Sequence, residues 1–413
     1  MIRSSKHSLK FANKSKRASI RAFLREYRRL LQVLIDSMWS GDLSGFDPSC
    51  NNLKCLSMLP NDYLKRHDSW FTARMKQCAG KQACSMVRAS VKKRDKQLYM
   101  LAKLQRKQEN TKYLQRKIDI QPLVKPSAEF AKVELDPRFI DFEDGSTFDL
   151  FVRVRTIGDD VTFNIPIKHT KVSRKWLDRG ELKHSIRLDE HCLTLIYEVP
   201  DVPKHSGETV GADQGYKTVL TLSDGQVTKP DKDGHNLGTI QARLSRRKKA
   251  SNGFKRSQSH RRNHINWALN QLNFSHIGEV RLEKIKGLRY RKRGQGVLLY
   301  WTYPLIKQKL VSLGEVEGFR FVEVSNQFRS QRCSRCSLVC KSSRKGKTFQ
   351  CAGCGYTLDA DLNAASNLEI DLFEIPWWVQ RSRINRDGFY WESDGIFSVG
   401  HEPIVRDTIR AVE

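Results

Sequence analysis

Three acidic side chains in the C-terminal half of the sequence lie at positions where carboxylates can converge on metal ions. Asp213 ends one apolar run and precedes a glycine turn, Glu283 follows a second apolar run, and Asp361 lies in the residue pattern of a helix start. Mg²⁺ prefers carboxylate oxygens as ligands. Two such ions stabilise the attacking water and the leaving oxygen when a phosphodiester is hydrolysed. The three acids are therefore candidates for a two-ion hydrolytic site.

Each of these acids has a simpler explanation when it is considered alone. An acid beside a glycine often serves a turn, and a glutamate at a strand end is often solvated. Asp359 also competes with Asp361 for the third position, because both lie at the start of the same expected helix. The hypothesis gains weight from a second motif, which lies between Glu283 and Asp361.

Two Cys-x-x-Cys pairs in this interval have the spacing of zinc ligands. Cys333 and Cys336 are followed by fourteen residues and then by Cys351 and Cys354. Two such pairs are typical of a zinc ribbon, and the alternative is that they are surplus free thiols. The other cysteines are interpreted as packing residues or, for the last, as a spare thiol inside the ribbon: Cys50, Cys55, Cys78, Cys84, Cys192 and Cys340.

The combination of these motifs resembles the TnpB family, whose members are transposon-encoded, RNA-guided DNA endonucleases related to the type V CRISPR effectors. The matching segments are Gly211 to Gly215, Glu283 to Gly287, Ser330 to Cys336, Cys351 to Tyr356 and Asp359 to Asn367. The resemblance extends from about residue 205 to about residue 370, and the N-terminal half matches in layout only. Ser337 is a departure, because the family usually has glycine after the second cysteine.

The resemblance implies a set of site residues and cofactors. Asp213, Glu283 and Asp361 would be the catalytic residues and the Mg²⁺ ligands, because the family's third acid directly precedes an x-Asn-Ala sequence, as Asp361 does. Asp359 is then interpreted as a helix N-cap. The four paired cysteines would hold a structural Zn²⁺, and a guide RNA would be a further cofactor.

The resemblance also implies a multidomain α+β architecture. A ribonuclease-H-like (RuvC) α/β nuclease domain with an inserted four-cysteine zinc ribbon would accompany a small β-barrel that contains an inserted helical domain. The expected boundaries are 1–14 and 112–205 for the barrel, 15–111 for the helical domain, 206–328 and 356–373 for the nuclease, 329–355 for the ribbon, and 374–413 for a C-terminal tail.

The periodicity of apolar residues predicts the elements around these motifs. Helical spacing predicts helices after Asn13, over about 61–77 and 81–110, over 236–273 (as one helix, or as two broken at Gly253), over 303–313, and from Asp359 to near Phe373. Alternation of apolar and polar residues predicts one early strand over 8–11. From about residue 114 onward it predicts a further set of strands: 132–135, 139–142, 148–155, 161–167, 182–188 and 192–199. Further strands are expected over 216–222 and 319–324, and the prolines of 200–207 predict a linker.

The charge of the chain indicates a polyanionic partner. Its 74 lysines and arginines and 45 acids leave a net charge of +29, which is tolerated best when a polyanion neutralises it. No apolar run approaches the roughly eighteen residues of a transmembrane helix, and the N-terminus lacks a signal-peptide core. We therefore expect a cytosolic protein that binds nucleic acid and no membrane, and the resemblance to the TnpB family implies the prokaryotic cytosol and nucleoid. A basic protein of the membrane surface is the alternative.

One basic segment, which has no acid between Asp233 and Glu279, is the main candidate for contacts with phosphates. A solvated face or a disordered segment is the alternative, although apolar residues near its end favour a helix. The candidate nucleic-acid-binding residues are Arg243, Arg246, Arg247, Lys248, Lys249, Lys255, Arg256, Arg261 and Arg262.

These features predict an RNA-guided, Mg²⁺-dependent DNA endonuclease that cleaves beside a short flanking motif. Its partners would be a guide RNA, the target double-stranded DNA and the displaced single strand, with monomer and dimer both open. The residues alone support only a metal-dependent phosphodiesterase acting on nucleic acid, and the guide dependence follows from the resemblance. The alternatives are a guided repressor that has lost cleavage and a transposase-type strand transferase.

Overall fold

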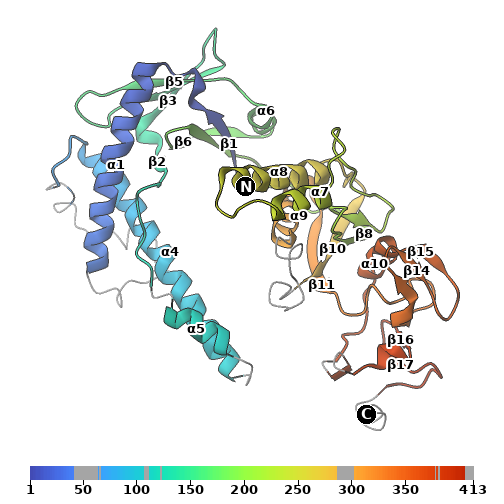
Figure 1. Cartoon of the computed structure of the whole chain (residues 1–413). Helices are drawn as coiled ribbons and strands as arrows, with labels where there is room; N and C mark the ends of the chain where they lie inside the picture. Colours follow the sequence, from blue (N-terminus) through green and yellow to red (C-terminus); the bar gives the residue numbers. More distant parts are fainter. Residues whose placement is uncertain are drawn as a thin grey trace. The chain divides into compact units, whose positions relative to one another are not determined.

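The chain folds into two compact units, Met1–Pro200 and Asp201–Glu413 (Figure 1). The computed structural model describes residues 1–40, 64, 67–106, 111–120, 123–285, 302–376, 378–379 and 382–404; Cys50 and Cys55 lie outside this part. The division falls at the start of the segment that the prolines predict as a linker. Both units combine helices with strands. No helix in the described residues is long and apolar enough to cross a membrane.

Long helices and antiparallel strands share the core of the first unit. The helices are α1 (Lys14–Ser40), α4 (Ala73–Arg106) and α5 (Lys112–Ile120). α1 buries the apolar residues that recur at helical spacing, as predicted, and α4 packs against it. The break expected near residue 80 does not occur, because Gly80 is buried beside Ala79 and Ala83 within one continuous helix. α5 also occupies residues where strands were expected.

Two sheets complete the first unit. Their strands are β1 (Ile2–Ser8), β2 (Val133–Leu135), β3 (Ile140–Glu143), β4 (Leu150–Val154), β5 (Phe163–Ile167), β6 (Glu181–Leu188) and β7 (Cys192–Glu198). The sheet orders are β1-β7-β6-β2 and β3-β4-β5, so the early strand joins the later ones. The early strand was predicted over residues 8–11, but β1 ends at Ser8. Residues Leu9–Phe11 form a 3-10 turn instead, and the Ser8 side chain caps it. A short helix, α6 (Lys171–Leu177), is an element that the alternation does not predict.

The second unit is organised around a mixed sheet with the order β11-β10-β8-β9. The strands are β8 (Glu208–Asp213), β9 (Thr221–Leu222), β10 (Ile277–Lys284) and β11 (Arg320–Ser325). β10 lies parallel to both β8 and β11, whereas β9 is antiparallel to β8. β9 is much shorter than the strand predicted over 216–222.

Three helices pack with this sheet around a second core. They are α7 (Leu237–Ser245), α8 (Asn252–Leu269) and α9 (Tyr303–Glu317). The long helical stretch is therefore two helices, but the break lies before Gly253 rather than at it. Ser251 is the N-cap of α8, because its side chain accepts a hydrogen bond of 3.1 Å from the backbone N–H of Phe254.

The cysteine segment, helix α10 and the C-terminal strands form the rest of this unit. The elements are β12 (Leu338–Val339), β13 (Arg344–Lys345), β14 (Thr348–Gln350), β15 (Thr357–Asp359), α10 (Ala360–Glu369), β16 (Phe389–Trp391) and β17 (Ile396–Phe397). α10 ends before the expected limit near Phe373. β12 pairs with β16, so the segment after α10 returns to the cysteine segment and buries Phe389 and Trp391 there.

Candidate active site

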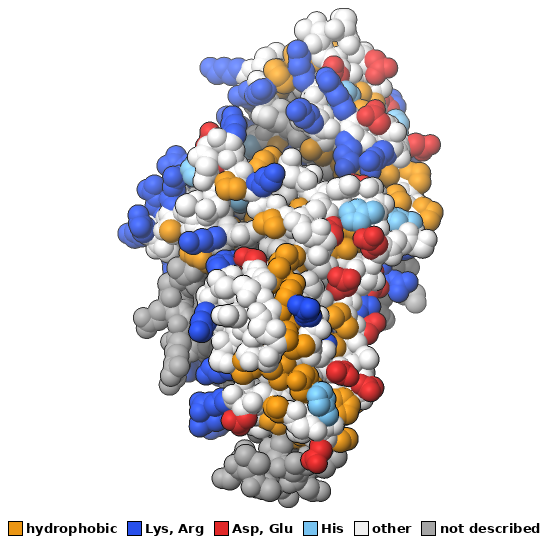
Figure 2. All heavy atoms as spheres, turned by 90° about the vertical axis from the view of Figure 1, so that its right-hand side faces the viewer, with side chains coloured by type: hydrophobic (Ala, Val, Ile, Leu, Met, Phe, Trp, Pro, Cys, Tyr) orange, Lys and Arg blue, Asp and Glu red, His pale blue; other side chains and the backbone are white. Residues whose placement is uncertain are grey.

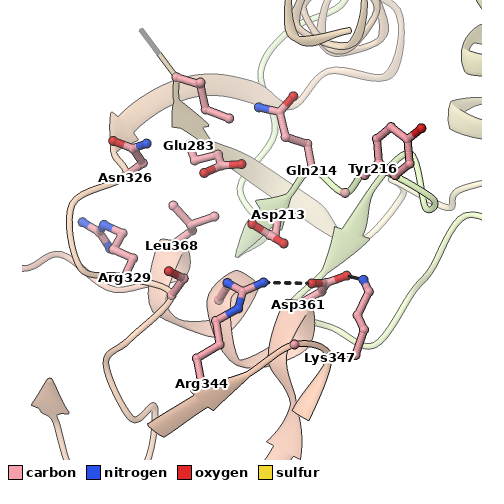
Figure 3. Close-up of a pocket in the computed structure, with 15 residues that line it drawn as sticks. Asp213, Gln214, Tyr216, Glu283, Asn326, Arg329, Arg344, Lys347, Asp361 and Leu368 are labelled. Carbon is pink, nitrogen blue, oxygen red and sulfur yellow. Dashed lines mark hydrogen bonds and ion pairs between the residues drawn. The ribbon is translucent and has the colours of Figure 1, made fainter. Parts of the chain in front are cut away.

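The three predicted acids line one cavity of about 480 Å³ (Figure 3). Asp213 ends β8, Glu283 lies near the end of β10, and Asp361 lies in the first turn of α10. The parallel register pairs Ala212 with Leu282, which brings the next residue of each strand, an acid, to the same edge of the sheet. Asp213 and Asp361 are buried, and Glu283 is partly buried.

Close packing of α10 on β8 delivers Asp361 to this edge. A Cβ atom on Gly211 would lie 1.9 Å from the carbonyl oxygen of Ala365, so only glycine permits this approach. The sequence singles out Gly211 as a motif residue but gives no sign of this packing role. Asp359 is the N-cap, as predicted, because its carboxylate accepts hydrogen bonds from the backbone of Asp361 at 2.9 Å and Leu362 at 3.1 Å. The two acids therefore have different surroundings.

Buried amides join α10 to the segment that leads into the cysteines. Asn363 and Asn367 are fully buried, and each donates to the carbonyl oxygen of Arg332, at 2.9 and 2.7 Å. The Arg332 guanidinium donates in turn to Asn367 Oδ1 at 2.6 Å. This network fixes the helix against the cysteine segment. Sequence reasoning uses Asn363 only as part of a motif and misses its structural role.

The electrostatics of the cavity favour a bound cation. Burial raises the pKa of Asp213 well above its ordinary value, and the negative charges of Glu283 and Asp361 raise it further. Burial also raises the pKa of Glu283 to about 7, against a lowering by a backbone hydrogen bond from Gln214. Carboxylates that repel one another in a site of low polarity are stabilised when a divalent cation neutralises them.

Two basic side chains from the cysteine segment reach Asp361, and sequence reasoning missed both. Arg344 Nη2 lies 3.4 Å from Asp361 Oδ1, and the Lys347 ammonium pairs with the other oxygen. Figure 3 shows both side chains extending from the β13 region toward the acid. No local pattern in the sequence marks them, because their approach depends on how β13 and β14 lie beside α10.

The four paired cysteines form a compact cluster, as predicted. All their sulfur atoms lie within 4.8 Å of one another, with 3.8 Å between Cys333 and Cys354 and 3.5 Å between Cys336 and Cys351. Tetrahedral zinc with Zn–S bonds of about 2.3 Å separates its sulfur ligands by roughly 3.8 Å. The donor set and its spacing thus fit zinc. Cys340 is outside the cluster and contacts Ser342 Oγ at 3.0 Å.

The two cysteine pairs end in the same backbone turn. Ser337 and Gly355, each following the second cysteine of its pair, have φ angles of +67° and +70°. The N–H of Ser337 donates to Cys333 O at 3.0 Å, and that of Gly355 donates to Cys351 O at 3.1 Å. The departure at Ser337 therefore leaves the shape of the first turn intact.

Comparison with known proteins finds similarity over parts of the chain. Residues 303–368 match the family model described as Cas12f1-like, TNB domain. The chain is 35% identical over 94 residues to the CRISPR-associated endodeoxyribonuclease Cas12f1 of Sulfoacidibacillus thermotolerans, covering 22% of each chain. It is 36% identical over 104 residues to a TnpB-like protein of Aquifex aeolicus, covering 23% of this chain and 34% of that one. These matches confirm the relationship to the TnpB and type V effector family.

More distant members of the family align over longer segments. The putative RNA-guided DNA endonuclease InsQ of Escherichia coli is 26% identical over 200 residues, which are 40% of this chain and 50% of InsQ. The match therefore spans half or less of each of these relatives. A solved Cas12f1–sgRNA–target DNA complex aligns with a TM-score of 0.53 at 15% identity, over 85% of this chain and 82% of that one. This likeness indicates a shared fold.

The basic segment that is the candidate for phosphate contacts lies on α7, on α8 and in their connection. Eight of its nine candidate residues are exposed, and Arg261 is intermediate. Arg243, Arg246 and Arg247 line a surface hollow of about 500 Å³. In the view of Figure 2, lysine and arginine side chains gather toward the top and the left edge, and acidic side chains lie mainly along the right edge. These positions leave the candidate residues accessible to a polyanion.

Proposed function

We propose that the protein is an RNA-guided, Mg²⁺-dependent DNA endonuclease that cleaves DNA beside a short flanking motif. The observation that carries this proposal is the meeting of Asp213, Glu283 and Asp361 at one cavity in a chain related to TnpB proteins. In the proposed site, all three acids are both catalytic residues and Mg²⁺ ligands. The phosphodiester is cut by water, without a covalent intermediate.

The residues present fit a pair of Mg²⁺ ions. The ligand atoms are carboxylate oxygens, which Mg²⁺ prefers. The negative charges of Glu283 and Asp361 both act on Asp213, so Asp213 is placed to be shared between two ions. When bound, the ions activate water and stabilise the leaving oxygen.

The basic residues beside the acids have their own role in this proposal. Arg344 and Lys347 lie against Asp361, at the wall of the cavity that a DNA backbone would have to approach. A guanidinium and an ammonium at that place can bind phosphate oxygens once the carboxylate interacts with a cation instead. They would position the scissile phosphate rather than transfer protons.

The topology supports the finer assignment of domains. The sheet of the second unit has two parallel pairs, β8–β10 and β10–β11, and one short antiparallel strand, β9. This arrangement, with acids at the strand ends, is consistent with a ribonuclease-H-like (RuvC) nuclease. The two antiparallel sheets of the first unit are consistent with a β-barrel, and α1, α4 and α5 lie between β1 and β2 in the chain, as an inserted helical domain would. The zinc ribbon would contact target nucleic acid.

The partners in this proposal are a guide RNA, the target double-stranded DNA and its displaced strand. The solved Cas12f1 relative is a complex with an sgRNA and target DNA. The exposed basic residues of α7 and α8 provide positive charge for such a polyanion. Base pairing with the guide would select the sequence, while the protein reads only the flanking motif.

A cleavage assay with matched variants tests the proposal. Asp213→Ala should abolish Mg²⁺-dependent cleavage of guided target DNA while leaving RNA and DNA binding in place, since removing one acid leaves the basic surface unchanged. Asp394→Ala, at an exposed position of the same unit, is the matched control and should cleave normally. Undiminished cleavage by Asp213→Ala would exclude the proposed site. Binding without cleavage in the wild-type protein would indicate a repressor, and joined strands would indicate a transferase.

A further inference from the structure

Four further metal-binding side chains come together at the start of α7 and on α8. Asp231 and His235 lie in the segment before α7, and His260 and His264 lie on α8. The two α8 histidines are four residues apart, so they project from the same face of the helix. α7 and α8 pack against each other, as Figure 1 also shows. None of the four residues lines the acidic cavity.

The spacing of their atoms suits a shared ion better than direct bonds. Asp231 Oδ1 lies 3.4 Å from His235 Nδ1, and Asp231 Oδ2 lies 3.9 Å from both His260 Nε2 and His264 Nδ1. Hydrogen bonds between such groups measure about 2.7–3.2 Å. Ligands of one tetrahedral ion at about 2.1 Å lie roughly 3.4 Å apart. Ligand atoms of Asp231, His235 and His260 all lie within 4.8 Å of one another, and His264 lies beside this group rather than in it.

Buried ring nitrogens at this place have no hydrogen-bond partner. His264 Nδ1 and His235 Nδ1 are both buried and make no hydrogen bond, and the His264 side chain is 2% exposed. A buried nitrogen without a hydrogen bond is costly, and a metal ion between Asp231 and His235 would satisfy His235 Nδ1.

Backbone hydrogen bonds hold the Asp231 carboxylate in place. Asp231 Oδ1 accepts hydrogen bonds from the backbone N–H groups of Asp233 at 3.0 Å and His235 at 2.9 Å. Such bonds fix the orientation of a metal-ligating carboxylate. Two imidazoles and one carboxylate suit zinc and the neighbouring first-row transition metals, whereas Mg²⁺ prefers oxygen ligands alone.

We propose that Asp231, His235 and His260 form a second zinc-type site, which takes Zn²⁺ or a similar first-row transition-metal ion. The ion fastens the segment before α7 to the middle of α8. This site is separate from the cysteine cluster and does not depend on nuclease activity. Because α7, α8 and their connection carry the basic residues, the ion also steadies the surface on which those residues lie.

Metal content is the first test. Protein purified without a histidine tag, loaded with Zn²⁺ and freed of excess by gel filtration, should contain two zinc ions per chain. His260→Asn, which changes a side chain that is 35% exposed, should contain one. His276→Asn is the matched control, because the His276 side chain pairs with Asp224 at 3.1 Å and belongs to neither metal-ligand group of the described residues, and this variant should retain two. One zinc ion in the wild-type protein, or two in His260→Asn, would overturn the proposal.

Cobalt substitution distinguishes the two sites, and its first measurement uses the wild-type protein alone. Co²⁺ bound by thiolates gives an intense charge-transfer band, whereas Co²⁺ bound by imidazole and carboxylate gives only weaker visible bands. Titration of the full chain should therefore show two spectral components. Asp231→Asn should lose the second component and keep the first, which also reports that the cysteine site is folded. A single thiolate component in the wild-type protein would overturn the proposal.

Discussion

At the scale of single residues, Glu283 links the pH of the solution to the stability of the fold. Its pKa is raised from an ordinary value of 4.5 to about 7, mainly because it is buried. The folded state therefore binds this proton more tightly than the unfolded state does. With divalent ions removed, the free energy of unfolding should fall as the pH rises from about 4.5 to about 7, by up to roughly 3 kcal/mol.

Glu283→Gln isolates this contribution, because other titrating groups change alike in both proteins. Urea unfolding at pH 5 and pH 8 should show a smaller loss of stability in the variant than in the wild-type protein. Adding Mg²⁺ at pH 8 should stabilise the wild-type protein more than the variant, since a cation neutralises the carboxylate. Parallel pH profiles for the two proteins would show that Glu283 is not the residue responsible.

Ser337 is a second residue whose chemistry can be separated into parts. Its φ of +67° costs a residue with a Cβ about 1 kcal/mol relative to glycine, while its Oγ accepts a hydrogen bond of 2.7 Å from Arg332. Ser337→Gly should be nearly neutral, because it removes both effects. Ser337→Ala should destabilise the ribbon by about 1 kcal/mol, because it keeps the strain and loses the bond. The rate of zinc release to a chelator measures the difference, and equal rates for Ser and Ala would contradict this account.

At the scale of elements, the contact between β8 and α10 determines where Asp361 lies. In Gly211→Ala the new Cβ would meet the carbonyl oxygen of Ala365 at 1.9 Å, so α10 must shift. We expect cleavage to fall much more than thermal stability does. Gly253→Ala is the control, because its Cβ would meet only the Arg247 side chain at 3.6 Å, and it should cleave normally. A fully active Gly211→Ala would show that the site tolerates the shift.

The connection between α7 and α8 is the element in which charge is most concentrated. Arg246, Arg247, Lys248 and Lys249 are consecutive and exposed. Replacing all four with alanine should weaken nucleic-acid binding for every sequence and flatten its salt dependence by roughly one unit of slope per lost phosphate contact. Zinc content and unfolding should stay unchanged, because these side chains contribute little to the core. An unchanged salt slope would mean that the segment is only a solvated surface.

At the scale of the whole molecule, the division into two units predicts that damage to one can leave the other intact. Cys351→Ser removes one ligand from a cluster whose metal supplies much of the ribbon's folding free energy. Limited proteolysis should then cut within the second unit and release a resistant fragment close to Met1–Pro200. Zinc analysis should show the loss of one ion per chain. Simultaneous digestion of both units would contradict this independence.

Local patterns in the sequence predicted those features that local physics decides. Alternation located most strands of the first unit, and the logic of strand ends brought Asp213 beside Glu283. The prediction of a break near Gly80 was wrong, because Gly80 is buried within α4 and this burial outweighs the poor helix propensity of glycine. The pairing of Arg344 with Asp361 could not be predicted, because it depends on the packing of separate elements. The histidines of α8 were also overlooked, since Asp231 is distant from them in the chain.

The pairing of β12 with β16 sets a limit for anyone who wishes to shorten this protein or fuse it to another. The family match ends at residue 368, which invites truncation just after α10. That cut would remove Trp391, whose backbone N–H donates to Ser337 O at 3.1 Å and whose carbonyl accepts from Arg332 at 2.8 Å. It would also leave β12 as an unpaired strand edge beside newly exposed apolar side chains, and such an edge can pair with another chain and cause aggregation. A minimal version should therefore retain the chain at least through β17.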